Sequence, residues 1–132
     1  MLWLRKSKKG FTLIELMVVV AIIGVLALLG LRLYTGQQEK AKNAVVKANA
    51  GSVQTLIQAE LADDPGLTAA EAVTLGAAAG LQNPFDSAGT TVQISTATDA
   101  EGVVEIALAD SVFTVTGLGS GPAIVITLTA RP

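Results

Sequence analysis

Glu15 is the residue whose chemistry is hardest to explain as packing alone. It is the only charged side chain between Phe11 and Leu31, in an otherwise apolar run. A carboxylate in such a run costs several kcal/mol unless it is protonated or paired with a cation. If this run only anchored the chain in a membrane, it would not need a carboxylate. The simpler alternative is that Glu15 reaches polar groups at the membrane surface. The chemistry that the Glu15 carboxylate can carry out is therefore pairing with a cation.

Two residue types that commonly carry catalysis are missing. The sequence contains no cysteine and no histidine. Their absence excludes thiol nucleophiles, disulfides, Ser-His-Asp catalysis and metal sites built on cysteine or histidine. We therefore expect no enzyme, no catalytic residue and no cofactor.

Two further segments have the composition of ion-binding loops. Gly117–Gly121 is glycine-rich, but it lacks the lysine of a phosphate loop and precedes a predicted strand, which favours a hairpin loop. Asp99 and Glu101 precede Gly102 and could bind calcium, although the ligand density of a calcium loop is missing. We expect a solvated turn at this pair and no metal site.

Charge is distributed unevenly along the chain. The net charge is −2, and four basic residues lie before Phe11. After Gly51 the only basic residue is Arg131, against nine acidic ones. A segment this acidic repels phosphate, so we expect it to bind no nucleic acid.

The apolar run has the length of a membrane span. The 21 residues from Phe11 to Leu31 would extend roughly 30 Å as a helix, the thickness of a hydrocarbon core. Basic residues immediately upstream predict a cytoplasmic N-terminus and export of the remainder. A secretory signal would be shorter and would end in a small-x-small cleavage site, which is not found before Arg32.

The junction before the span reads Lys8-Lys9-Gly10-Phe11-Thr12-Leu13-Ile14-Glu15. A small glycine between basic residues and a bulky apolar one suits a peptidase that cuts before the helix. The string KKGFTLIELMVVVAIIGVLALLG resembles the class III signal of type IV pilins and of the related pseudopilins of type II secretion and DNA-uptake machines. The rest of the chain has no recognisable likeness.

The resemblance implies a role for each residue of the junction. Residues 1–10 would be a leader that a prepilin peptidase removes between Gly10 and Phe11, and Phe11 would then be N-methylated. Glu15 would lie one helical turn from the new amine and could partly neutralise it. In a filament, Glu15 would pair with the Phe11 amine of a neighbouring subunit, and the cost of an unpaired charge would set the register.

The resemblance also implies partners and a location. The subunit would wait in the inner membrane and then enter a homo-oligomeric helical filament on the cell surface. A platform protein and an ATPase would drive assembly, and the filament would serve attachment, motility or DNA uptake. A type II secretion pseudopilin is the alternative within the family. A monomeric membrane-tethered binding domain is the alternative from another class.

Many type IV pilins carry a proline in the outer part of this helix. This chain departs from that pattern, because it has no proline before Pro65. Gly24 and Gly30 are then the predicted weak points of the helix, since a glycine there costs up to about 1 kcal/mol relative to alanine.

The pattern predicts three parts: a leader at 1–10, a transmembrane and assembly helix at 11–35, and an exported head at 36–132. A helix should continue to the sequence Asp63-Asp64-Pro65-Gly66, which ends it. On this helix we expect a thin solvated strip, made by Asn43, Lys47, Gln54 and Gln58. Opposite we expect an apolar face that is buried either against a sheet or against other subunits, made by Ala41, Val45, Ala48, Val53, Leu56 and Ala59.

The remaining sequence predicts a short helix and a sheet. Thr68-Ala69-Ala70-Glu71 has the pattern of a capping box and should open a helix over about 68–79. Period-two alternation then predicts four strands near 91–129, with Gly117–Pro122 as the last connection. Short connections favour an antiparallel meander. We expect an α+β fold in which this sheet packs on the second half of the long helix.

Overall fold

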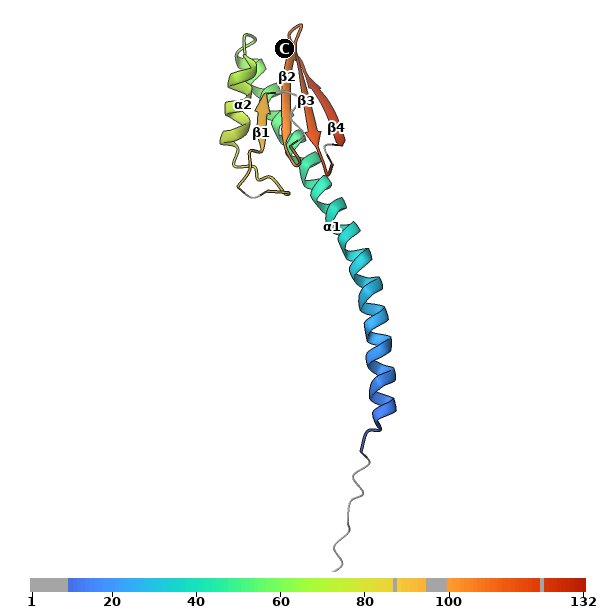
Figure 1. Ribbon diagram of the computed structural model, residues 1–132. Helices are drawn as coiled ribbons and strands as arrows, with labels where there is room; N and C mark the ends of the chain where they lie inside the picture. The colour runs from blue at the N-terminus through green and yellow to red at the C-terminus, as the bar shows by residue number, and fades with distance from the viewer. Residues whose placement is uncertain (1–9, 87, 95–99, 122) are drawn as a thin grey trace, which may run out of the picture. The chain divides into compact units, whose positions relative to one another are not determined.

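A computed structural model describes residues 10–86, 88–94, 100–121 and 123–132. Its elements are two helices, α1 (Leu13–Asp63) and α2 (Ala69–Ala78), and four strands, β1 (Val92–Ile94), β2 (Val104–Ala109), β3 (Val112–Leu118) and β4 (Ile124–Ala130) (Figure 1). The chain divides into two compact units, 1–37 and 38–132. The boundary falls within α1, so the first unit contributes only the beginning of this helix.

In the first unit, every described side chain of α1 is exposed. Among the described residues, α1 is the one helix that is long and apolar enough to cross a membrane by length and composition. It ends at Asp63, as the sequence predicted. The basic residues before Gly10 lie outside the described part.

In the second unit, four strands form one sheet in the order β1-β2-β3-β4. The pairs β2–β3 and β3–β4 are antiparallel, which confirms the meander over these three strands and the α+β class. The first pair differs, because β1 lies parallel to β2, with Val92 opposite Val104. The prediction that all four strands are antiparallel was therefore wrong for β1.

Chain length explains this difference. Strand β1 has three residues and so extends only about 10 Å. Nine residues separate Ile94 from Val104, and at up to about 3.3 Å each they can retrace that distance and re-enter the sheet in the same direction. A short connection forces an antiparallel pair only when the strands are long compared with it.

The hairpins follow turn chemistry. Asp110 and Ser111 alone join β2 to β3, and both have positive φ (50° and 62°), as two-residue hairpin turns require. Gly117 was predicted to lie in a loop, but it belongs to β3 and pairs with Ile126. A Cβ at Gly117 would lie 2.9 Å from Val46 Cγ1, so the missing side chain lets β3 approach α1 closely.

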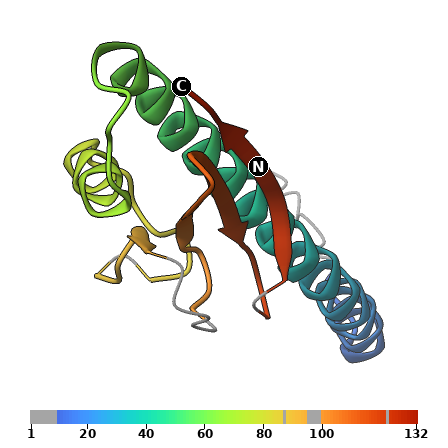
Figure 2. The same ribbon diagram turned by 90° about the horizontal axis from the view of Figure 1, so that it is seen from above.

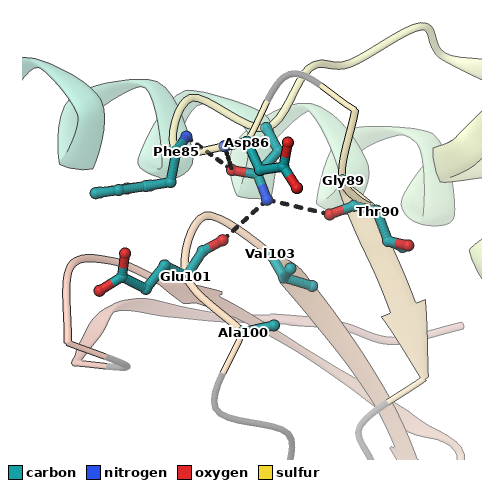
Figure 3. Close-up of a pocket in the computed structure, with 8 residues that line it drawn as sticks. Phe85, Asp86, Gly89, Thr90, Ala100, Glu101 and Val103 are labelled. Atoms are coloured by element: carbon teal, nitrogen blue, oxygen red, sulfur yellow. Dashed lines mark hydrogen bonds between the residues drawn. The ribbon is translucent and has the colours of Figure 1, made fainter.

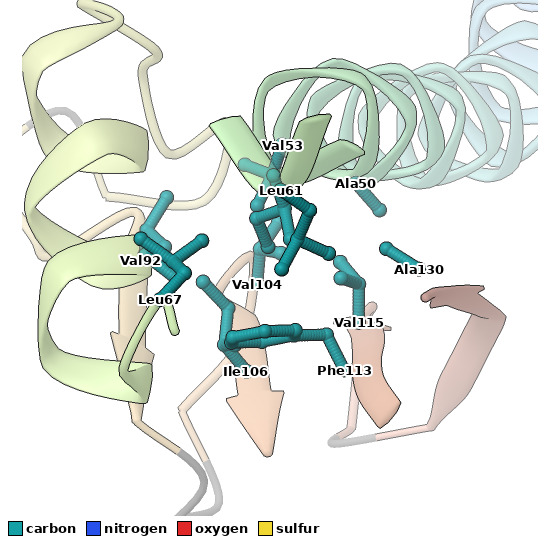
Figure 4. Packing of buried hydrophobic residues seen from close by; sticks show 12 residues of the cluster. Ala50, Val53, Leu61, Leu67, Val92, Val104, Ile106, Phe113, Val115 and Ala130 are labelled. Atoms are coloured by element: carbon teal, nitrogen blue, oxygen red, sulfur yellow. The ribbon is translucent and has the colours of Figure 1, made fainter. Parts of the chain in front are cut away.

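The core lies between α1 and one face of the sheet, with α2 at the side of the β1 end (Figure 2). Figure 4 shows Phe113 and Val115 of β3 and Ile106 of β2 pointing toward α1. The buried apolar cluster comprises Ala50, Val53, Ile57, Leu61, Leu67, Ala72, Val92, Val104, Ile106, Phe113, Val115 and Ala130.

The buried face of α1 differs from the predicted one. It comprises Val46, Asn49, Ala50, Val53, Ile57 and Leu61. Of the six residues predicted to be buried (Ala41, Val45, Ala48, Val53, Leu56, Ala59), only Val53 is, while Val45 and Leu56 are 44% and 37% exposed. This part of α1 has small apolar residues nearly all round, so periodicity alone did not choose a face. The face with the bulkier side chains packs on the sheet because it fills the core better.

The predicted polar strip is also not simply solvated. Gln54 Nε2 donates to the carbonyl oxygen of Thr129 at 2.8 Å, and Gln58 Nε2 donates to that of Arg131 at 2.7 Å. Thr129 lies at the C-terminal end of β4, and Arg131 directly follows this strand. These two side chains therefore connect α1 to the edge of the sheet.

Helix α2 begins as predicted, with Thr68 as N-cap. Glu71 Oε2 accepts hydrogen bonds from Thr68 Oγ1 at 2.7 Å and from Thr68 N at 2.9 Å. These hydrogen bonds, the side-chain one first, favour the ionised carboxylate and hold the pKa of Glu71 below its ordinary value.

Acid should therefore weaken the start of α2. With its pKa lowered in the folded state, Glu71 stabilises the fold fully above the ordinary glutamate pKa of about 4.3. That contribution disappears as the pH falls through the lower folded-state pKa. We expect Glu71→Gln, which can still form a capping box, to lose less thermal stability than the wild type between about pH 6 and about pH 3. Melting temperatures measured across this range test it, and parallel pH profiles would contradict it.

Candidate functional site

The segment that precedes α1 carries the residues singled out by the sequence. Gly10, Phe11 and Thr12 lie before the first helical residue, Leu13, and Phe11 is 83% exposed. The peptide bond between Gly10 and Phe11 is therefore in an exposed, non-helical segment. An accessible bond outside a helix can enter a peptidase active site without unwinding a helix.

Glu15 is tied to Thr12 at the start of the helix. Thr12 N and Thr12 Oγ1 donate to Glu15 Oε2 at 3.0 and 2.9 Å, and Glu15 N donates to Thr12 Oγ1 at 3.3 Å. This is a capping box, the same arrangement as at Thr68 and Glu71. We predicted the second box and missed the first, although Thr-x-x-Glu before an apolar run was visible in both places.

The capping box uses only one of the two carboxylate oxygens of Glu15. Both hydrogen bonds from Thr12 go to Oε2, and no residue in the described part donates to Oε1. Around the carboxylate, apolar side chains form a shallow hollow of about 360 Å³, lined by Phe11, Ile14, Glu15, Val18 and Val19. Glu15 can thus accept from an additional cation while its own helix holds it in place.

The predicted weak points lie within regular helix. Helix α1 continues without interruption through Gly24 and Gly30. A Cβ at either position would meet nothing within 4 Å, so packing within the described chain does not require a glycine there. Their proposed role in local unwinding stays a prediction.

The glycine-rich segment after β3 is held as a hairpin connection. Ser120 N donates to Asn43 Oδ1 on α1 at 3.1 Å, and Gly121 N donates to Glu101 Oε1 at 2.7 Å. Asp99 lies outside the described residues. Within the described ranges, no group of three acidic, histidine or cysteine side chains is placed to hold a metal ion.

Asn83 connects the loops beside this hairpin (Figure 3). Its Nδ2 donates to the carbonyl oxygens of Thr90 and Glu101, and its Oδ1 accepts from the backbone N–H groups of Phe85 and Asp86. The hollow around it, of about 440 Å³, is therefore lined by an amide whose hydrogen bonds are already made within the chain. This network fixes the geometry of the loops.

Comparison with known proteins points to the same segment as the capping box. Residues 5–31 match the family model of the prokaryotic N-terminal methylation motif. The fimbrial protein EcpB of Eikenella corrodens is 49% identical over 56 residues, which are 42% of this chain and 35% of EcpB. The type IV major fimbrial protein FimA of Dichelobacter nodosus is 40% identical over 60 residues, 46% of this chain and 38% of FimA. The type IV major alpha-pilin of Moraxella bovis is 42% identical over 55 residues, again 42% and 35%.

The N-terminal part of the chain is therefore similar to type IV pilins. The match spans little more than a third of the length of these pilins, and no solved structure matches the chain. The methylation motif contains Thr12 and Glu15, so the capping box lies in the part of the chain that carries the family likeness.

Proposed function

We propose that this chain is a structural subunit of a type IV pilus or a pilus-like filament. The observation that carries the proposal is the apolar first part of α1, residues 13–37, whose side chains are all exposed and which opens with a carboxylate that has one oxygen free of hydrogen bonds from the described residues. An exposed apolar surface of this size needs lipid or other helices around it. The N-terminal likeness to type IV fimbrial proteins supports the same assignment.

Processing would complete the site. In this proposal a prepilin peptidase cuts between Gly10 and Phe11, and Phe11 is N-methylated. The new Phe11 amine lies four residues before Glu15 and carries a positive charge. In the filament, Glu15 Oε1 accepts from the Phe11 amine of a neighbouring subunit. Because both charges are then surrounded by apolar side chains, a misplaced subunit leaves them unpaired at a high cost.

Assembly would start from the inner membrane. Helix α1 holds the subunit there until a platform protein and an ATPase transfer it into a filament on the cell surface. The exposed face of the second half of α1 includes several small residues, which allow helices to approach closely: Ala41, Ala44, Ala48, Ser52 and Ala59. The presence of Glu15 favours a polymerising subunit, because the proposed contact between subunits uses its carboxylate. A type II secretion pseudopilin would use the same contacts in a shorter filament.

Mass spectrometry of the cell-associated protein tests the processing step. We expect an N-terminal peptide that starts at Phe11 and carries one extra methyl group. Gly10→Val is the matched control, because a branched side chain beside the scissile bond should leave the chain uncut. A tethered binding domain would keep the residues before Phe11. An uncut wild-type chain, or a cut after Leu31, would therefore contradict the proposal.

A further inference from the structure

Strand β4 is an edge strand with little protection of its own. Among the described residues, it is the last strand of the sheet and pairs with β3 alone. Its sequence, Ile-Val-Ile-Thr-Leu-Thr-Ala, has no charge and no proline. Such segments expose a row of backbone donors and acceptors and pair readily with copies of themselves. Near its start, the pairing of β4 with β3 is irregular at Gly117 and Leu118. The C-terminal half of β4 has no such irregularity.

At this half, two glutamines of α1 occupy backbone acceptors. Gln54 bonds to the carbonyl of Thr129 and Gln58 to that of Arg131. Carbonyls two residues apart on a strand point to the same side and are about 6.7 Å apart. Side chains four residues apart on a helix are displaced by about 6 Å along its axis. The two spacings nearly match, so one helix row can follow one strand edge.

A third amide of α1 extends the same row. Asn43 lies on the same side of α1 and binds Ser120 in the connection that leads into β4. The row continues with Lys47, an exposed lysine, and lysine is a residue that commonly discourages edge pairing. The amides of α1 therefore bind the backbone on both sides of β4, at the connection before it and at the carbonyls of its C-terminal end.

We propose that Gln54 and Gln58 form an amide latch that closes the edge of β4 to the β4 strand of a second copy. Without the latch, two copies can pair their β4 strands antiparallel about a two-fold axis. Copies anchored in one membrane meet often, and that circumstance rests on the proposed function. With the latch closed, association is left to α1.

Disulfide trapping in the full chain, in detergent micelles, tests the latch. The sequence has no cysteine, so Thr127→Cys introduces a single thiol on exposed β4. We expect Gln54→Leu/Gln58→Leu to raise the yield of oxidised dimer about tenfold or more, because two hydrogen bonds that keep the edge occupied are lost. Circular dichroism checks that the fold is retained.

Two controls separate edge pairing from other effects. Gln37→Leu/Gln82→Leu makes the same change in composition away from β4 and should leave the dimer yield at the parent level. A variant with Ala77→Cys in place of Thr127→Cys carries its single thiol on α2. Its dimer yield reports random collisions. Cross-linking that rises equally at Ala77→Cys would overturn the latch.

An unchanged yield at Thr127→Cys in the folded double variant would also overturn it. If the double variant fails to fold, the single variants Gln54→Leu and Gln58→Leu carry the test. We expect each to give an intermediate rise in dimer yield, and no rise in either would overturn the latch. The experiment requires neither cleavage nor filaments. If the latch holds in this experiment but mass spectrometry finds the wild-type chain uncut in cells, the proposed function alone is refuted. If the chain is cut at Phe11 but the dimer yield does not rise, the latch alone is refuted.

Discussion

Replacing Glu15 with alanine is expected to abolish filaments while leaving the chain in the membrane. The substitution removes the one charged group of the apolar span, and with it the proposed partner of the neighbour's Phe11 amine. An unpaired cation among apolar helices costs several kcal/mol, enough to prevent a subunit from entering the filament. Electron microscopy of sheared surface filaments, together with immunoblots of the membrane fraction, measures both outcomes.

A second substitution separates the charge of Glu15 from its cap. Glutamine can still accept from Thr12 and complete a capping box, but it carries no charge. If pairing drives assembly, Glu15→Gln should lose filaments as Glu15→Ala does. Glu39→Gln, an exposed acid further along α1, should assemble normally. Normal filaments from Glu15→Gln would show that the cap matters and the charge does not, and the proposed registration would be wrong.

Phe113→Ala is expected to lower the free energy of unfolding of the second unit by about 3–5 kcal/mol. Phe113 is among the largest fully buried side chains and lies beside Ile106 in the core cluster (Figure 4). Its removal leaves a cavity in this cluster, and close-packed neighbours relax into such a cavity only in part. This loss is a large fraction of the stability of a domain of this size.

Urea titration of the full chain in detergent, followed by hydrogen exchange of the β3 and β4 amides, measures the loss. Ile124→Ala is the matched control, because Ile124 is 68% exposed at the start of β4 and should change the stability by less than about 0.5 kcal/mol. A cost below about 1 kcal/mol for Phe113→Ala would mean that the core is not built as described.

Local patterns were sufficient wherever the neighbours of a residue in the sequence are also its neighbours in space. The apolar run before Leu31, the end of α1 at Asp63 and the capping box at Thr68 are all of this kind. The family likeness also lies in such a segment, because its residues act in order along one helix. The capping box at Thr12 belongs to the same class and was open to prediction by the same pattern.

The tertiary structure decided what depends on partners distant in the sequence. In the second half of α1, small apolar residues surround nearly the whole helix. Only contact with the sheet selected the face of Ile57 over that of Leu56. The direction of β1 depended on how far its connection could reach.

The glutamines of α1 show the limit most clearly. By composition they belong to a solvated strip, and periodicity placed them correctly on one side of the helix. Their partners are carbonyls more than seventy residues away, at Thr129 and Arg131. A backbone carbonyl leaves no mark in the sequence, so only the folded chain could reveal that these amides close a strand edge. The sequence by itself thus determined the long helix, its apolar first part and the position of its carboxylate. The packing of α1 beside β4 determined which contacts the second half of the helix makes.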